Sequence, residues 1–213
     1  PAWAAQNRPA APAPMMTASK NGVDTGLQGG GQSRTLSPSA RVALAFYNSR
    51  MNLPAHQLSM TVLMSPDMAN FSGNVHGGAV LRLLDQVAYA CASRYSGCYV
   101  VTLSVDQVMF LQPIHVGELV TFLASVNHTG KSSMEIGIKV IAEDIRTQVV
   151  RHVNSCFFSM VAVDDAGKPT PVSPFTPASD DERRRWDAAL LRKALRHEQA
   201  QRHEQIRRAH AAR

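Results

Sequence analysis

NFSGNVHGG, residues 70–78, leads directly into AVLRLLDQVAYACASRY, residues 79–95, and these two stretches decide the fold. Apolar side chains recur in the second stretch at intervals of three or four residues, the period of one helix face, at Val80, Leu84, Val87, Cys91 and Tyr95. The stretch is apolar on nearly every side, which predicts a buried helix. One carboxylate, Asp85, lies in its middle. A carboxylate in a buried helix is costly unless it is satisfied or used, so Asp85 is the first candidate for a functional residue.

Strands are expected on both sides of this helix. One apolar, β-prone segment precedes it at His56–Met64. Consecutive antiparallel strands are expected after it at Tyr99–Leu111, Glu118–His128, Ser132–Glu143 and Val149–Asp164. This order predicts an α+β fold, in which a curved antiparallel sheet wraps around one long central helix. A single sheet leaves its edges open, so pairing with a second copy of the chain is expected.

The chain is expected to have three parts. Residues 1–50 are rich in Pro, Ala, Gly and Ser, so this leader is expected to be disordered apart from a short helix at Arg41–Arg50. The chain begins with Pro, and part of the leader is expected to be non-native because alternative starts exist at Met15, Met16 and Met51. Residues 51–178 form the predicted domain. Residues 179–213 are predicted to form a charged C-terminal helix whose final turns are solvated or frayed.

The net charge of +6 comes from the two ends of the chain. Residues 51–178 carry 7 basic and 9 acidic side chains, so a basic surface for nucleic acid is not expected on the domain. No apolar run approaches the roughly 18 residues that a transmembrane helix needs, and no secretory signal is expected. The three cysteines lack the Cys-x-x-Cys spacing of metal or redox sites. These features predict a soluble, cytoplasmic protein without a membrane span.

Four motifs together carry a resemblance to a known family. They read ANFSGNVHGGAVLRLLDQVAYACASRYSG, VTLSVDQVMFLQPIHVGELVTF, TGKSSMEIGI and RHVNSCFFSMVAVDDAGKP. In this order they resemble the hot-dog-fold acyl-CoA thioesterases related to brain acyl-CoA hydrolase, of the bacterial single-domain type, over about Leu53–Pro174. The resemblance implies a helix wrapped by a sheet, a homodimer with a continuous sheet, and commonly a homohexamer made of three dimers. It also implies hydrolysis of a fatty acyl-CoA to free acid and CoA, within fatty acid metabolism.

The resemblance also implies a catalytic pair, an Asn before the helix and an acidic residue inside it, acting across the dimer interface. In this chain the pair falls on Asn70 and Asp85, fifteen residues apart. Asp85 is then a general base for water, or a nucleophile that passes through an anhydride. From the residues alone, an ion pair of Asp85 with Arg82 is equally open. Asn70 alone is more typical of a turn or helix cap, and the resemblance gives it the role of positioning water or the thioester.

The residues at the start of the helix are candidates for carbonyl stabilisation. The free N–H groups of a first helical turn can donate to a developing oxyanion, which assigns this role to Gly78 or Gly77. The alternative is that the two glycines only permit close packing of helix and sheet. His76 is a candidate for substrate binding, and equally a structural hydrogen-bonding residue. It also suggests an alternative function, since hot-dog dehydratases or hydratases use a His and a carboxylate.

Binding of CoA requires partners for its phosphates. Residues Gly130, Lys131, Ser132 and Ser133 form a candidate anion-accepting turn, and Arg151 or the run Arg183–Arg185 can reach the 3′-phosphate. Such a charge run is also typical of a solvated helix face. No metal is predicted, because no group of His, Cys, Asp or Glu has metal-ligand spacing. No cofactor is predicted either, since CoA is part of substrate and product. A third possibility is a non-catalytic acyl-CoA sensor that uses the basic tail.

Overall fold

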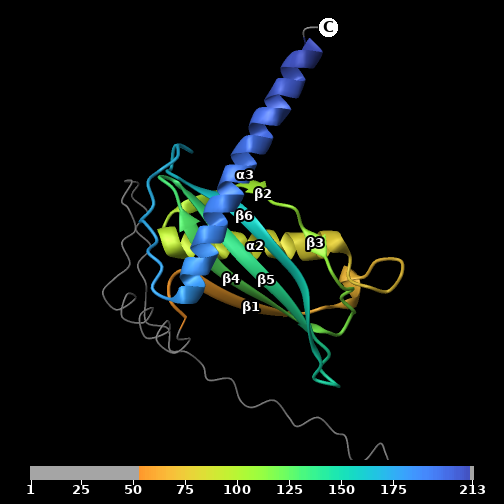
Figure 1. Ribbon diagram of the computed structural model, residues 1–213. Helices are drawn as coiled ribbons and strands as arrows, with labels where there is room; N and C mark the ends of the chain where they lie inside the picture. The colour runs from red at the N-terminus through yellow and green to blue at the C-terminus, as the bar shows by residue number, and fades with distance from the viewer. Residues whose placement is uncertain (1–52, 212–213) are drawn as a thin grey trace, which may run out of the picture. The chain divides into compact units, whose positions relative to one another are not determined.

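The computed structural model describes residues 53–211 (Figure 1). These include nearly all of the predicted domain and of the C-terminal helix. The predictions for residues 1–50, including the helix at Arg41–Arg50, lie outside the described residues. Among the described residues, no helix is both long and apolar enough to cross a membrane.

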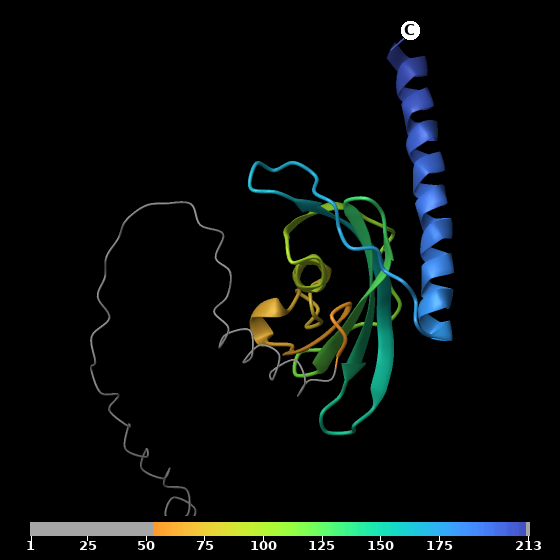
Figure 2. The same ribbon diagram turned by 90° about the vertical axis from the view of Figure 1, so that its left-hand side faces the viewer.

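One antiparallel sheet forms the body of the fold. Its strands are β1 (Gln57–Leu63), β2 (Tyr99–Val105), β3 (Met109–Phe110), β4 (Leu119–Thr129), β5 (Ser133–Glu143) and β6 (Val150–Val163). They are arranged in the order β1-β4-β5-β6-β2, and β3 also pairs with β6. The sheet curls around helix α2 (Gly77–Ser96), which Figure 2 shows end-on inside the curve, and helix α3 (Asp180–Ala211) lies on the other side of the sheet. The expected α+β architecture is confirmed.

Helix α2 occupies the position that the apolar period predicts. It begins after His76, whose Nδ1 accepts a hydrogen bond from the N–H of Gly78 at 2.9 Å. It ends at Gly97, whose φ of 69° is the left-handed conformation typical of a helix C-cap. One face packs against the inward side chains of the sheet, and its buried residues are Val80, Leu83, Leu84, Val87, Ala88, Cys91 and Ala92.

The expectation that α2 is buried on nearly every side is wrong for the single chain. Its second face is open, with Leu81 41% and Tyr89 42% exposed, and Asp85 between them is also exposed. The reason is geometric: the curled sheet covers one side of the helix, and no other element among the described residues covers the opposite side (Figure 2).

The single strand expected at Tyr99–Leu111 is also wrong, because the chain forms two strands there. Val105 of β2 pairs with Phe158 of β6, and the next pairing, Met109 with Ser155, belongs to β3. The intervening chain leaves the ladder after Asp106, whose N–H still donates to Phe157 O at 2.9 Å and whose carboxylate accepts a hydrogen bond from Arg196 of α3 at 2.7 Å.

Helix α3 docks on the outer face of the sheet through both apolar and charged side chains. Ala189 is buried, and the ring of Trp186 lies 4.6 Å from that of His128. Arg192 and Arg196 both donate to Glu135 of β5, at 2.6 and 3.1 Å. The helix begins in a capping box, in which Glu182 accepts from the N–H of Ala178 at 2.7 Å and the N–H of Glu182 donates to Ser179 Oγ at 3.3 Å. Its final turns are exposed, as expected, but they remain helical to Ala211.

Candidate active site

The exposed face of α2 presents Asp85 toward strand β2. The hydroxyl of Thr102 donates a hydrogen bond to Asp85 Oδ1 at 2.7 Å. The alternative ion pair with Arg82 does not form among the described residues. One carboxylate oxygen is therefore held by a neutral donor while the side chain stays open to solvent on this face. Such a carboxylate can accept a proton or attack an electrophile.

Thr102 was not among the residues that the sequence singled out. The alternating pattern of β2 placed it on a polar strand face, which is ordinary for a threonine. Its contact with Asp85 depends on how β2 is aligned along α2. Neither the helical period of α2 nor the alternation of β2 specifies that alignment, so no signal in the single sequence marks Thr102.

Asn70 organises the tight turn that precedes α2. Its Oδ1 accepts hydrogen bonds from the backbone N–H groups of Ser72, at 2.9 Å, and Asn74, at 3.2 Å. Its backbone carbonyl accepts from Gly73, whose φ of 79° requires a residue that tolerates the left-handed region. The side-chain oxygen is thus occupied within the turn, as the cap interpretation predicts. The hydrogen bonds of the described residues leave the amide NH₂ of Asn70 as the group that can donate to a ligand.

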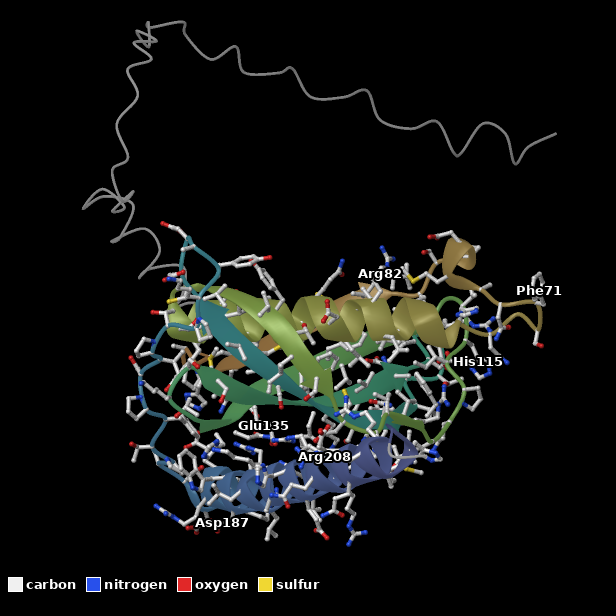
Figure 3. The ribbon with its side chains drawn as sticks, turned by 90° about the horizontal axis from the view of Figure 1, so that it is seen from above. Phe71, Arg82, His115, Glu135, Asp187 and Arg208 are labelled. Atoms are coloured by element: carbon white, nitrogen blue, oxygen red, sulfur yellow. The ribbon has the colours of Figure 1, made fainter. Side chains whose placement is uncertain are left out.

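The structure does not bring Asn70 and Asp85 together within one chain. Asp85 lies eight residues into α2 from Gly77, which is about 12 Å along the helix axis. The turn that contains Asn70 lies beyond the N-terminal end of α2, on the side away from Asp85. Figure 3 shows Phe71, the next residue in the chain, beyond this end of the helix.

The turn is anchored by the segment before β4. The N–H of Val75 donates to Ile114 O at 2.8 Å, and Asn74 and His115 form a β-bridge. Glu118 supports this segment by accepting from the backbone N–H of His115 at 2.9 Å and from Arg151. Burial by itself would raise the pKa of Glu118, but the hydrogen bonds from His115 and Arg151 outweigh it and hold that pKa below its usual range. Arg151 is therefore engaged inside the protein.

At the helix start the two glycines differ. The N–H of Gly78 donates to His76 Nδ1, so His76 is a helix cap. In the neutral imidazole, the proton is then on Nε2. Gly77 is the first residue of α2, where backbone N–H groups lack partners within the helix. A Cβ atom added to Gly77 would lie 3.7 Å from Phe110, an ordinary contact, so close packing does not require glycine there.

The turn at Gly130–Ser133 lies far from these residues. It joins β4 to β5, and its backbone is closed by hydrogen bonds from Gly130 N to Ser133 O at 2.7 Å and from Ala162 N to Ser132 O at 2.9 Å. The carbonyl of Lys131 accepts from Val172 at 3.0 Å. Strand β4 has 11 residues and separates this turn from Glu118 by about 40 Å along the chain. Within one chain, the candidate CoA-binding residues thus fall into two separate groups.

The two buried cysteines of the described residues are unsuited to nucleophilic catalysis. Burial raises the pKa of the Cys91 and Cys156 thiols to about 12, so neither is a nucleophile at neutral pH. Among residues 53–211, no group of three or more His, Cys, Asp or Glu is arranged to hold a metal ion.

Comparisons with known proteins identify the family of this chain. A family model described as the thioesterase superfamily matches residues 72–149. Protein VdlD of Helicobacter pylori is 52% identical over 140 residues, which are 66% of this chain and 80% of that protein. A crystal structure of an apo-hexameric acyl-CoA thioesterase is 34% identical, with a TM-score of 0.66, over 68% of this chain and 92% of the other. The chain belongs to the hot-dog thioesterase superfamily. The resemblance stated from the four sequence motifs is confirmed.

A third relative bears on the site. The acyl-CoA hydrolase of Staphylococcus aureus, solved with butyryl coenzyme A and coenzyme A, is 30% identical with a TM-score of 0.63, over 70% of this chain and 94% of the other. Solved variants of that enzyme replace an asparagine, an aspartate and a threonine by alanine, and these three are spaced 15 and 17 residues apart. Asn70, Asp85 and Thr102 have the same residue types at the same spacing.

Proposed function

We propose that this chain hydrolyses acyl-CoA thioesters to the free fatty acid and CoA. The observation that carries the proposal is the hydrogen bond from Thr102 to Asp85 on the open face of α2. It joins two members of the Asn, Asp and Thr set whose types and spacing recur in the Staphylococcus aureus hydrolase. CoA is part of the substrate and product, so the proposed reaction uses no cofactor.

The proposed chemistry assigns one task to each residue. Asp85 removes a proton from water as the water oxygen attacks the carbonyl carbon, and the C–S bond then breaks with return of the proton to the CoA thiolate. Alternatively, Asp85 attacks the carbonyl carbon and expels the CoA thiolate, and water then hydrolyses the resulting anhydride to the free acid and the Asp85 carboxylate, its released proton going to the thiolate. Thr102 fixes the orientation of the Asp85 carboxylate in either route. The amide NH₂ of Asn70 orients the water or the thioester.

The oxyanion donor in this proposal is the N–H of Gly77. The N–H of Gly78 already donates to His76, whereas Gly77 lies at the positive end of the helix dipole. His76 then contributes as the cap that fixes the first turn. Its role as a helix cap also weakens the dehydratase alternative, because one of its ring nitrogens is occupied.

We further propose that the active form is a homodimer. Large apolar side chains are exposed along α2, β2 and β3, namely Leu81, Tyr89, Tyr99, Val101, Leu103, Val105, Met109, Phe110 and Leu111. A concentration of exposed large apolar side chains on neighbouring elements is typical of a protein interface. Strand β2 is an edge of the sheet, so a second copy can continue the ladder there. In such a dimer Asn70 of one chain approaches Asp85 of the other.

We propose that three such dimers form a hexamer, since one solved relative is described as a hexameric acyl-CoA thioesterase. In that assembly the Gly130–Ser133 turn of another chain supplies contacts to the CoA phosphates. A cytoplasmic location remains a prediction from the sequence.

The decisive measurement is release of free CoA from acyl-CoA, followed with a thiol reagent. We expect Asp85→Asn to lower turnover by a factor of about 100 to 10,000. Asp165→Asn, in an exposed turn after β6, removes the same charge and should retain wild-type turnover. Near-normal turnover of Asp85→Asn refutes the mechanism. Hydration of an enoyl-CoA without CoA release identifies the protein as a hydratase, and acyl-CoA binding without either reaction identifies it as a sensor.

A mixed dimer tests the proposed interface. Asn70→Ala and Asp85→Asn should each be inactive alone, but random exchange of their subunits gives dimers in which one of the two sites has both residues. An equal mixture should therefore recover about a quarter of the wild-type activity. Absence of recovery, with subunit exchange verified by mass, shows that the two residues do not act across the interface.

A further inference from the structure

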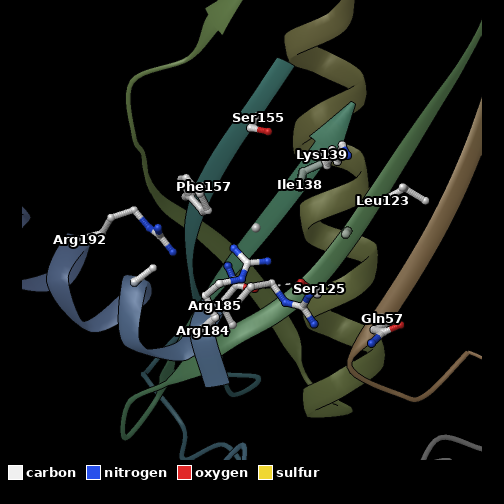
Figure 4. Close-up of a pocket in the computed structure, with 14 residues that line it drawn as sticks. Gln57, Leu123, Ser125, Ile138, Lys139, Ser155, Phe157, Arg184, Arg185 and Arg192 are labelled. Atoms are coloured by element: carbon white, nitrogen blue, oxygen red, sulfur yellow. Dashed lines mark hydrogen bonds between the residues drawn. The ribbon is translucent and has the colours of Figure 1, made fainter. Parts of the chain in front are cut away.

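A groove runs between α3 and the outer face of the sheet, on the side away from Asp85. It has a volume of about 420 Å³, which is in the range of small-molecule sites. Its floor includes Gly137 of β5, over which the Asn127 side chain packs so closely that an added Cβ atom would come within 2.3 Å of Asn127 Nδ2. Figure 4 shows Arg184 and Arg185 extending from α3 toward Ser125 on this floor.

The charges around the groove have one sign. Four basic side chains line it, and no acidic side chain of the described residues does: the basic residues are Lys139, Arg184, Arg185 and Arg192. Like charges collected in a partly enclosed space repel one another, and their combined field attracts an anion. The composition of the lining thus favours a negatively charged occupant.

Two of these four cations have acidic partners just outside the groove. Arg192 donates to Glu135 at 2.6 Å, and its guanidinium lies 3.5 Å from the centre of the Phe157 ring, so its position is fixed. Arg184 pairs with Asp181 at 3.3 Å, but both side chains are about three-quarters exposed, so this pair is weak.

The other two cations remain without such compensation. Within residues 53–211, neither Lys139 nor Arg185 has an acidic side chain at ion-pair distance. Lys139 extends from β5 and Arg185 from α3, so one ligand that contacts both would connect the helix to the sheet.

We propose that this groove binds a small phosphorylated anion carrying two adjacent phosphate groups, held by Lys139 and Arg185. Guanidinium and ammonium groups are the usual protein partners of phosphate, and a diphosphate carries enough charge to engage cations on two elements at once. The proposal concerns binding only, and no acidic side chain of the described residues lines the groove. A diphosphate group occurs both in CoA and in free polyphosphates, and the proposed ligand of the groove is the diphosphate group that they share.

The test is calorimetric titration of the full chain with inorganic pyrophosphate at low ionic strength, without acyl substrate. We expect one pyrophosphate per chain, and at least about a tenfold rise in Kd for Arg185→Gln and for Lys139→Gln. Arg183→Gln is the matched control. It removes the same charge from the same turn of α3, but Arg183 is exposed and does not line the groove, so its Kd should equal that of the wild type.

The outcomes are separable. The proposal is overturned if the wild type does not bind pyrophosphate, or if Arg183→Gln and Arg185→Gln weaken pyrophosphate binding equally. It is also overturned if Arg185→Gln changes the oligomeric state, because a second copy of the chain would then be the occupant of the groove. Free CoA distinguishes the sources: if Arg185→Gln weakens CoA and pyrophosphate alike, the groove takes the CoA diphosphate. If it weakens pyrophosphate alone, the ligand is a free polyphosphate. Circular dichroism verifies that α3 is intact, and failure of the proposed hydrolysis leaves this measurement unaffected.

Discussion

Replacing Thr102 by Val should slow thioester hydrolysis while leaving the fold and the assembly intact. Valine has nearly the shape of threonine but cannot donate the 2.7 Å hydrogen bond to Asp85 Oδ1. A hydrogen bond to a charged group contributes about 1.5–3 kcal/mol. If the Thr102–Asp85 bond acts in the transition state, its loss lowers kcat by a factor of about 10 to 150. Thr102→Ser keeps the hydroxyl group and should retain most of the activity.

The assay is CoA release at saturating and at limiting acyl-CoA, so that kcat and KM are obtained separately. A residue that orients the reacting carboxylate should change kcat at nearly constant KM. Light scattering must show the same assembly for both Thr102 variants, because β2 belongs to the apolar face proposed as the interface. Equal kcat values for Thr102→Val and Thr102→Ser would refute the reasoning. The hydrogen bond would then be a structural contact without a part in the reaction.

Two further predictions concern stability. Glu118→Gln should cost about 2 kcal/mol at pH 7, because it removes the charged partner of the largely buried Arg151. The folded pKa of Glu118 is lowered, so its stabilisation is fully present above the unfolded pKa near about 4.3 and is lost as the pH falls through the folded value. The difference in thermal midpoint from wild type should therefore shrink between pH 7 and pH 3, and a constant difference contradicts the charge assignment. Gly137→Ala should cost about 1–3 kcal/mol because its Cβ would meet buried Asn127 at 2.3 Å. Gly77→Ala, with room for the methyl group, is the control, and equal unfolding midpoints of the two variants would be the contrary result.

Local patterns in the sequence were sufficient for the elements of the fold. The helical period of Val80, Leu84, Val87 and Cys91 predicts α2, and Gly97 ends it as a C-cap does. The strands that alternate strictly were predicted to within about two residues. The break between β2 and β3 was missed because the chain leaves the ladder only at Gln107 and Val108, and neither the alternating period nor a turn residue marks these two positions.

The site was less predictable than the fold, because its residues act through contacts between elements. Asp85 was singled out as a candidate from its unusual place in an apolar helix, whereas its hydrogen-bond partner Thr102 was not. Arg151 was expected to face a phosphate, but it pairs with Glu118 in a position that only the folded segment before β4 creates. His76 was correctly considered as a structural hydrogen-bonding residue, since the cap of a helix lies at a fixed offset from its start.

The wrong expectation about α2 is itself informative about the assembly. Its sequence is apolar on two sides, yet the sheet covers only one, and Leu81 and Tyr89 remain 41% and 42% exposed. Burying one large apolar side chain contributes about 1.5–3 kcal/mol. Burial of several such side chains on α2, β2 and β3 together offsets the roughly 4–15 kcal/mol that association costs in lost translational and rotational freedom. In the proposed dimer, Asp85 is then enclosed by apolar side chains of both chains. The apolar pattern of the α2 sequence thus matches the burial of this helix in the proposed dimer rather than in the single chain. Activity and association should accordingly be lost together when this face is made polar.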